Sequence, residues 1–313
     1  PSVLSEAVAN AWDADAATVD IKVFKSGKKI VICDDGQGMN VNDANQKFLH
    51  VGYRRREEGE KITPKYKRPV MGRKGIGKLS LFSIAKTIEV YSAKRGKKIA
   101  FRMVLDEIKD AIKTGTGSYK PKSIGAGSCP VPLRKGTCIV LTDLKKRLDG
   151  THSDLRRRLA RRFSIIGKEH KFAINIDGKP VTACDRDYFN KIQFMWFYGK
   201  QSSSYASLCN HLQESQERPN TIGDNFSISG WIGTVSESGQ LKDPILKENL
   251  NKIVIMVRGK LAQEDILEEF NEGVLYSAYL MGEIHADFID DDDKEDIATT
   301  SRQRVIEDDP RYQ

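Results

Sequence analysis

A glycine-rich, cationic stretch, MGRKGIGKLSLFSIA, spans residues 71–85 and places three glycines and two lysines before an apolar, helix-like run. Glycine lets the backbone present its N–H groups to a ligand, and the dipole of a helix adds positive potential at its first residues. Such a turn can hold a phosphate. Its spacing fits neither GxxxxGK[ST] nor the dinucleotide motif GxGxxG, so this stretch alone predicts a structural turn as readily as a phosphate site.

A polar stripe on the first predicted helix offers oxygen ligands. Glu6, Asn10 and Asp13 stand at i, i+4 and i+7, so their side chains leave the helix on one face. A carboxylate and an amide one turn apart suit a magnesium ion and a base that orients water. The alternative is a stripe that simply faces solvent.

The end of a predicted strand supplies another carboxylate. The strand KIVICDD leads into DDGQGM, where Asp34 precedes Gly36 and Gly38. Glycine at these positions lets a ligand approach the backbone closely. This loop is therefore a second candidate for ligand binding.

The pattern of apolar residues predicts an α+β fold that positions these groups. A helix over residues 4–17 precedes a hairpin of two strands, ATVDIKVF and KKIVICDD. Residues 40–70 are polar and charged, and we expect a long mobile connection there. The elements expected after it are the helix behind the glycines, the strands TIEVYSAK, KKIAFRMV and GTCIVLTDL, a basic helix over 152–166, the strands FSISGWIGTV and KIVIMVRGKLA, and a helix in ILEEFNEGVLYSAYLMGEI that runs into a strand.

The composition points to a soluble globular protein. No run of eighteen apolar residues and no signal peptide is visible, and the five cysteines form no CxxC, so we expect buried thiols in a reducing, cytoplasmic setting, or in the nucleus of a eukaryote. The net charge of +8 is uneven: residues 1–105 carry 21 basic and 11 acidic side chains (+10), and residues 264–313 carry 4 and 16 (−12). The basic end could meet nucleic acid, pair with the acidic end or be solvated.

Taken together, the motifs resemble those of the GHKL ATPases, a family that comprises gyrase B, the heat-shock ninety-kilodalton chaperones, sensor histidine kinases and MutL, with the microrchidia ATPases close by. The matching motifs are ExxxNxxD (Glu6, Asn10, Asp13), DxGxGM (Asp34, Gly36, Gly38, Met39), GxxGxGK (Gly72, Gly75, Gly77, Lys78) and the strand opening Gly136-Thr137. The resemblance covers residues 1 to about 145. It implies the Bergerat fold, an α/β sandwich whose lid, here residues 40–71, closes over ATP.

The resemblance implies a role for each matching residue. Glu6 matches the general base that polarises the attacking water, Asn10 matches a ligand of Mg²⁺, and Asp13 lies near the nucleotide. Asp34 matches the reader of adenine, and Thr137 helps to hold a water beside the base. The other residues expected to bind nucleotide are Gly36, Gly38 and Met39 around the base, and Gly72, Lys74, Gly75, Ile76, Gly77 and Lys78 at the phosphates.

The second half resembles the transducer domain of the dimerising, clamp-type members. The sequence TTSRQ is similar to the chaperones' loop whose arginine reaches the ATP site when the lid closes. On this resemblance Arg302 contacts the γ-phosphate, and pairing with the acidic run over 290–296 is the alternative. The expected domains are an ATP-binding domain over residues 1–185, a linker or irregular segment over 186–224 and a smaller transducer-like α/β domain over 225–313.

The activity expected from these motifs is the binding and hydrolysis of Mg-ATP. Binding of the nucleotide closes the lid and favours a homodimer. The basic lid and the compact transducer favour a microrchidia-like or MutL-like ATPase that acts on double-stranded DNA, with no membrane partner. Two alternatives stay open: a protein-remodelling chaperone, and a regulatory module that binds ATP without hydrolysing it.

Overall fold

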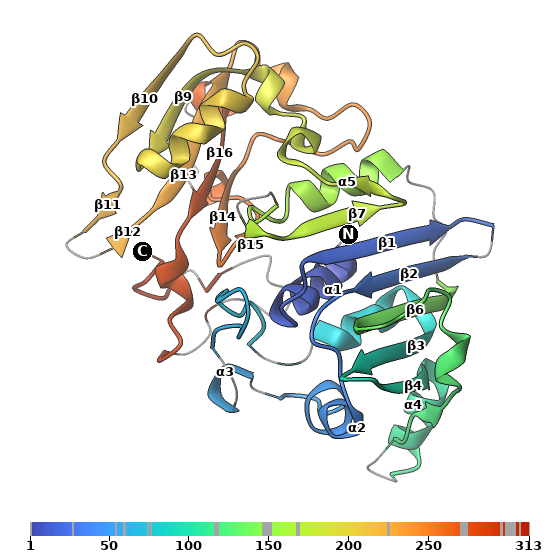
Figure 1. The fold of residues 1–313 in the computed structure, drawn as a ribbon. Coiled ribbons are helices and arrows are strands. Elements are labelled where there is room, and N and C mark those ends of the chain that lie inside the picture. The colour runs from blue at the N-terminus through green and yellow to red at the C-terminus, as the bar shows by residue number, and fades with distance from the viewer. Residues whose placement is uncertain are drawn as a thin grey trace. The chain divides into compact units, whose positions relative to one another are not determined.

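The structure is a computed structural model in which the chain divides into two compact units, Pro1–Leu159 with Ile166–Val181, and Ala160–Ile165 with Thr182–Gln313 (Figure 1). It describes residues 2–26, 28–53, 55–58, 61–73, 75, 77–115, 119–145, 152–166, 170–223, 226–269, 275–294, 297, 305–306 and 308–312.

The first unit is built on an eight-stranded sheet with the strand order β5-β4-β3-β6-β2-β1-β7-β8. Its described strands pair in antiparallel fashion except β1 with β7, which are parallel. The bounds are β1 Thr18–Phe24, β2 Lys29–Asp34, β3 Ala85–Lys94, β4 Lys97–Val104, β5 Lys122–Ser123, β6 Gly136–Leu144, β7 Ala173–Ile176 and β8 Lys179–Pro180. The predicted hairpin and the three strands that follow it are confirmed, because their apolar runs form the centre of this sheet.

The helices of the first unit are short. Leu4, Val8 and Ala11 of the first helix are buried, so its apolar face belongs to the core and its polar face is left for the site. The bounds are α1 Ser2–Asp13, α2 Val41–Asp43, a π-helix Ala44–Phe48, α3 Arg55–Glu58, a 3-10 helix Gly77–Ser83, α4 Leu105–Lys113, a 3-10 helix Ala126–Ser128 and α5 His152–Ala160. The helix expected after the glycines is therefore of the 3-10 type, and α4 was not predicted.

The second unit is built on a six-stranded sheet with the order β10-β9-β13-β16-β14-β15, and a two-stranded sheet of β11 and β12. Trp231, Met195 and Ile192 lie at the centre of one of its apolar clusters. The bounds are β9 Ile192–Tyr198, β10 Glu214–Arg218, β11 Thr221–Ile222, β12 Phe226–Ser227, β13 Ser229–Val235, β14 Ile253–Val257, β15 Lys260–Gln263 and β16 Leu280–His285. Its 3-10 helices are Ala183–Arg186, Phe189–Lys191, Lys200–Leu208, Ser238–Leu241, Leu267–Glu269, Leu275–Tyr279 and Asp287–Asp290.

Two features of the second unit differ from the sequence-based expectations. Residues 186–224 are not a linker, because β9 lies inside the six-stranded sheet between β10 and β13. The helix expected in ILEEFNEGVLYSAYLMGEI is replaced, in the part that the structure describes, by two 3-10 helices before β16. The chain also crosses between units at residues 159–166 and 181–182 rather than once near residue 185.

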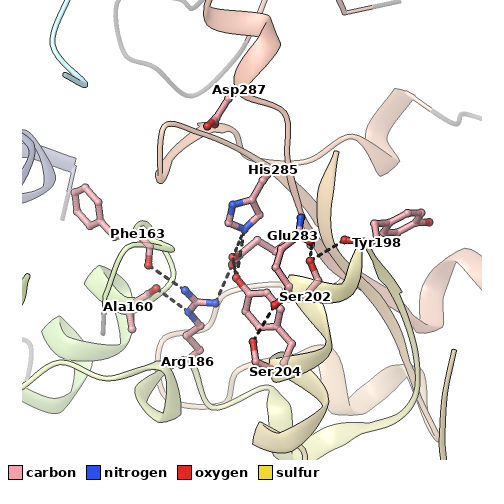
Figure 2. Close-up of polar contacts among 12 residues, drawn as sticks. Ala160, Phe163, Arg186, Tyr198, Ser202, Ser204, Glu283, His285 and Asp287 are labelled. Carbon is pink, nitrogen blue, oxygen red and sulfur yellow. Dashed lines mark hydrogen bonds and ion pairs between the residues drawn. The ribbon is translucent and has the colours of Figure 1, made fainter. Parts of the chain in front are cut away.

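A buried ion pair stabilises the second unit (Figure 2). The Arg186 guanidinium, 2% exposed, donates to Glu283 Oε2 at 3.0 Å and to the carbonyl oxygens of Ala160 and Phe163 at 3.1 and 3.0 Å. Burial alone would raise the pKa of Glu283, but the Arg186 charge and a hydrogen bond from His285 outweigh it and lower that pKa to about 2. The pair fixes the segment around residues 160–163 to β16.

The cysteines do not all match the expectation of buried thiols. Cys33 and Cys138 face each other across β2 and β6 and form a disulfide, and Cys184 is exposed. Among the described residues there is also no helix that is both long and apolar enough to span a bilayer.

Candidate nucleotide-binding site

The polar face of α1 lies against the glycine-rich turn. Asp13 is buried, and its two carboxylate oxygens accept hydrogen bonds from the backbone N–H groups of Met71 at 2.7 Å and Gly72 at 2.8 Å. The indole of Trp12 donates to the Pro69 carbonyl at 2.9 Å. The carboxylate that was expected near the nucleotide therefore also fixes the start of the glycine-rich turn onto the first helix.

Gly77 brings the same turn against Glu6. A Cβ atom at Gly77 would overlap the Glu6 carboxylate, so only glycine leaves room for that side chain in its observed place. Glu6 is partly exposed and Asn10 is exposed. Within the described residues the Asn10 side chain makes no hydrogen bond, which leaves its oxygen free to bind a ligand. The first and third motifs thus meet at a carboxylate, an amide and a glycine backbone.

The carboxyl group of Asp34 is partly buried at the end of β2. Its Oδ1 accepts hydrogen bonds from the backbone N–H groups of Gly36 at 2.9 Å and Thr137 at 3.3 Å. Burial raises the pKa of Asp34 to about 7, although these two hydrogen bonds act in the opposite direction. Gly136, with φ +97°, has no room for a Cβ atom because the Asp34 carbonyl occupies that space. The second and fourth motifs therefore meet around one partly buried carboxyl group.

Ser92 links these two motifs from β3 and was not predicted. Its buried Oγ donates to the Gly136 carbonyl at 3.0 Å, accepts from the backbone N–H of Met39 at 2.8 Å and lies 3.1 Å from Thr137 Oγ1. Gly38, with φ +66°, lies against the Ala93 carbonyl too closely for any side chain. A serine within a strand carries no sequence signal of its own, and only the register that places Ser92 opposite Thr137 reveals it.

The loop after Asp34 is fixed to the end of α1. The backbone N–H of Gln37 donates to the Ala14 carbonyl at 2.8 Å, and a Cβ atom at Gly36 would crowd the same carbonyl at 2.7 Å. The Asp35 carboxylate accepts from the N–H groups of Ala17 and Thr18 at 2.7 and 2.9 Å. All four motifs are therefore connected within the first unit.

The last part of the expected lid is fixed to the body of this unit. Asp15 accepts hydrogen bonds from the backbone N–H groups of Lys65 at 2.6 Å and Tyr66 at 3.1 Å. Arg68 donates to the carbonyl oxygens of Ala16, at 2.5 Å, and Lys171, at 2.7 Å. The expectation of a mobile connection over residues 40–70 is wrong for this part, because these hydrogen bonds hold residues 65–68 to both ends of the domain.

Lys78 contacts the first part of the lid. Its Nζ donates to the carbonyl oxygens of Lys47 at 3.0 Å and His50 at 2.6 Å. Burial lowers the pKa of Lys78 to about 8. Lys78 is therefore held against the lid in this structure, and its contact with phosphate stays a prediction. Lys74, Ile76 and Arg302, which were also predicted to bind the nucleotide, lie outside the described residues.

Comparison with known proteins agrees with this geometry. Residues 1–128 match the family described as "Histidine kinase-, DNA gyrase B-, and HSP90-like ATPase". These residues belong to the GHKL family. The resemblance inferred from the four motifs is confirmed, and so is the expected fold, a GHKL-type ATPase domain with a second α/β domain. The GHKL domain implies ATP binding.

A relative is similar over nearly the whole chain. The protein called "Putative type II restriction enzyme HgiDII", from Herpetosiphon aurantiacus, is 41% identical over 308 residues, which is 97% of this chain and 48% of the relative. The chain therefore spans about half the length of that relative. The likeness extends through both units and is not limited to the GHKL domain.

The donor set of the GHKL domain fits a magnesium ion that is held mainly by nucleotide. Mg²⁺ prefers oxygen ligands and keeps several from water and phosphate rather than from a full protein cage. Glu6 and the Asn10 side chain offer such oxygens one helical turn apart. No group of three or more His, Cys, Asp or Glu side chains suited to a metal occurs in the described ranges. A site made by Asn10 and phosphate oxygens fits both the amide oxygen on α1 and the lack of a larger ligand cluster in the described ranges.

Proposed function

We propose that this chain binds Mg-ATP and hydrolyses it. The observation that carries the proposal is the convergence of four separate motifs, through Asp13 with Gly72, Glu6 with Gly77, Gly36 with Ala14 and Asp34 with Thr137. Transfer of a phosphoryl group to water needs positioning and charge stabilisation more than covalent help, so one base, one metal and fixed backbone dipoles suffice.

The roles follow from the environment of each side chain. Glu6 accepts a proton from the attacking water and orients it, because it is the partly exposed carboxylate beside the turn that holds the phosphates. Asn10 would hold the metal, which neutralises phosphate charge when bound. Asp34 accepts a hydrogen bond from the exocyclic amine of adenine, and Thr137, Gly38 and Met39 surround the base. Gly75 and Gly77 present their N–H groups to the phosphates, whereas the N–H of Gly72 donates to Asp13 and holds the turn in place.

We further propose that ATP closes the lid and favours a homodimer, with Arg302 on the γ-phosphate. The lid is held at two places, and this supports a hinge between them. Residues 65–68 are held by Asp15 and by the Arg68 contacts, whereas the π-helix Ala44–Phe48 is held by Lys78 through carbonyls near its end. Closure would then involve the segment between these two anchors.

DNA is the partner that the available observations favour. The name of the relative describes an enzyme that acts on DNA, and residues 1–105 carry a net charge of +10. Phosphate neutralisation by such a surface is the main source of affinity for nucleic acid. A polypeptide client, the alternative, has no comparable support. An ATPase that acts on cellular DNA would work in the cytoplasm, or in the nucleus of a eukaryote.

The test is steady-state hydrolysis of Mg-ATP by the wild type and by Glu6→Ala, with binding measured on the same samples. Loss of a general base lowers turnover by about 100-fold to 10,000-fold, while the binding of ATP stays within about threefold. Asp106→Ala removes an exposed carboxylate from α4 and serves as the matched control. Wild-type turnover in Glu6→Ala would overturn the role of Glu6, and binding without any turnover in the wild type would favour a regulatory module.

A further inference from the structure

A basic cavity of about 640 Å³ lies in the first unit, beside the loop that carries Asp34. Its lining comes from four separate segments: Gln37, Pro64 with Lys65, the β3–β4 turn, and the residues before β6. The lining residues are Gln37, Pro64, Lys65, Lys94, Arg95, Gly96, Arg134 and Lys135. Five of these eight residues are cationic, and none of them is acidic.

The charged groups of this cavity are hydrogen-bond donors. Lys94 pairs with Asp43 at 2.7 Å and the Lys65 ammonium donates to the Tyr66 hydroxyl at 2.8 Å. Arg95, Arg134 and Lys135 make no ion pair with any described residue. The amide nitrogen Nε2 of Gln37 is buried and has no hydrogen-bond partner in the described part of the chain. Cationic donors, three of which have no ion-pair partner among the described residues, are complementary to a ligand that offers several anionic oxygens.

The basic surface continues beyond the cavity. Lys97 and Lys98 stand next to Arg95 in the same β-turn region and are exposed, and Lys67 follows Lys65 in the exposed turn of the lid. A small anion would contact only the cavity itself. Cations that extend beyond the cavity suit a polymeric ligand that carries one charge on each unit. The phosphodiester backbone of DNA is such a polymer.

We infer that this cavity, defined by Lys65, Lys94, Arg95, Arg134 and Lys135, is a contact site for the phosphate backbone of double-stranded DNA. The inference rests on the proposed action on DNA and names the surface of the GHKL domain that the duplex meets. The contacts position the duplex and do not read its sequence, because phosphates carry no base identity.

The test counts phosphate contacts by their dependence on salt. Binding of a 30-base-pair duplex is measured by fluorescence anisotropy over a series of salt concentrations, for the wild type and for Arg95→Ala/Arg134→Ala/Lys135→Ala. Each neutralised phosphate contributes about 0.9 to the slope of log affinity against log salt, so the triple variant is expected to lose about 3 from this slope.

A matched control removes the same charge elsewhere. Lys109→Ala/Lys113→Ala/Lys120→Ala takes three exposed lysines from α4 and the residues after it. These follow the far end of β4, whose eight residues span about 25 Å from the β3–β4 turn. The control is expected to keep the wild-type slope within about 1. Circular dichroism and thermal unfolding show whether both variants remain folded.

The outcomes separate the inference from the function on which it rests. A smaller slope of log affinity against log salt in the cavity variant alone supports the site. Equal slopes in the two triple variants overturn the site and leave the action on DNA standing, and a wild type that does not bind the duplex overturns both. Binding of Mg-ATP, measured separately, tests the ATPase proposal alone. If inorganic tripolyphosphate or ATP binds at the cavity and the duplex does not, the ligand is a small polyphosphate and the inference is wrong.

Discussion

The affinity of the site for adenine should depend on the protonation of Asp34. Burial raises the pKa of this carboxyl group to about 7, so the free protein holds it as a mixture of acid and carboxylate near neutral pH. Only the carboxylate accepts hydrogen bonds at both oxygens, and Oδ1 already accepts two from the backbone. The exocyclic amine of adenine therefore needs the ionised form at Oδ2.

The size of the effect follows from the ionised fraction. With a pKa of about 7, the carboxylate makes up about 90% of Asp34 at pH 8 and about 10% at pH 6. The apparent affinity scales with the competent fraction, so it should fall about tenfold between pH 8 and pH 6, or about 1.4 kcal/mol. The stability of the free protein changes in the opposite direction. The folded state holds its proton more tightly than the unfolded chain, so the contribution is complete below pH 3.8 and is lost as the pH rises through 7.

The assay is calorimetric titration with adenosine from pH 5.5 to pH 8, because adenosine has no phosphate group that titrates in this range. Asp34→Asn is the matched control, since the amide keeps an acceptor but has no proton to lose. The wild type should show the tenfold slope and Asp34→Asn should show none. An affinity of the wild type that stays constant over this range, or an equal slope in both proteins, would refute the role of the Asp34 carboxylate.

Three further substitutions test separate contacts. Gly77→Ala should displace the carboxylate beside it and lower ATP turnover by about 10-fold to 100-fold, whereas Gly125→Ala, where nothing lies within 4 Å, should leave turnover unchanged in the same assay. Lys78→Met removes two hydrogen bonds to lid carbonyls, so stopped-flow measurement should show nucleotide release that is about tenfold faster. An unchanged rate would contradict a role of Lys78 in holding the lid. Glu283→Ala leaves the Arg186 guanidinium buried without its carboxylate, so denaturant unfolding should show a loss of about 3–5 kcal/mol, most of which the additional change Arg186→Met should restore.

Periodicity and motif spacing predicted the centre of the first unit. The sheet contains β1, β2, β3, β4 and β6 as adjacent strands, and each is an apolar run in the sequence. Local pattern and tertiary packing therefore agree. The pattern did not predict β9, although its sequence IQFMWFY is a strong strand signal, because the polar residues that follow it dominated the segment. Composition over a long window therefore concealed a short strand that lies inside the second sheet.

The chemistry of the site was predictable by residue type and not by environment. The helical spacing placed Glu6, Asn10 and Asp13 on one face, but it could not show that Asp13 is buried against a turn 58 residues away. The anchors Asp15 and Arg68 and the connecting Ser92 act through contacts that are distant in the sequence. Such roles depend on strand register and on the path of the lid, and neither is visible in a single sequence.

Calorimetric titration of Mg-ATP into this chain, with Asp34→Ala as the control, tests the central claim most directly. The account predicts saturable binding with one site per chain in the wild type, and loss of that binding in Asp34→Ala while the variant remains folded. Absence of binding to the folded wild type, or equal binding to both proteins, would contradict the claim that the four motifs form one ATP site.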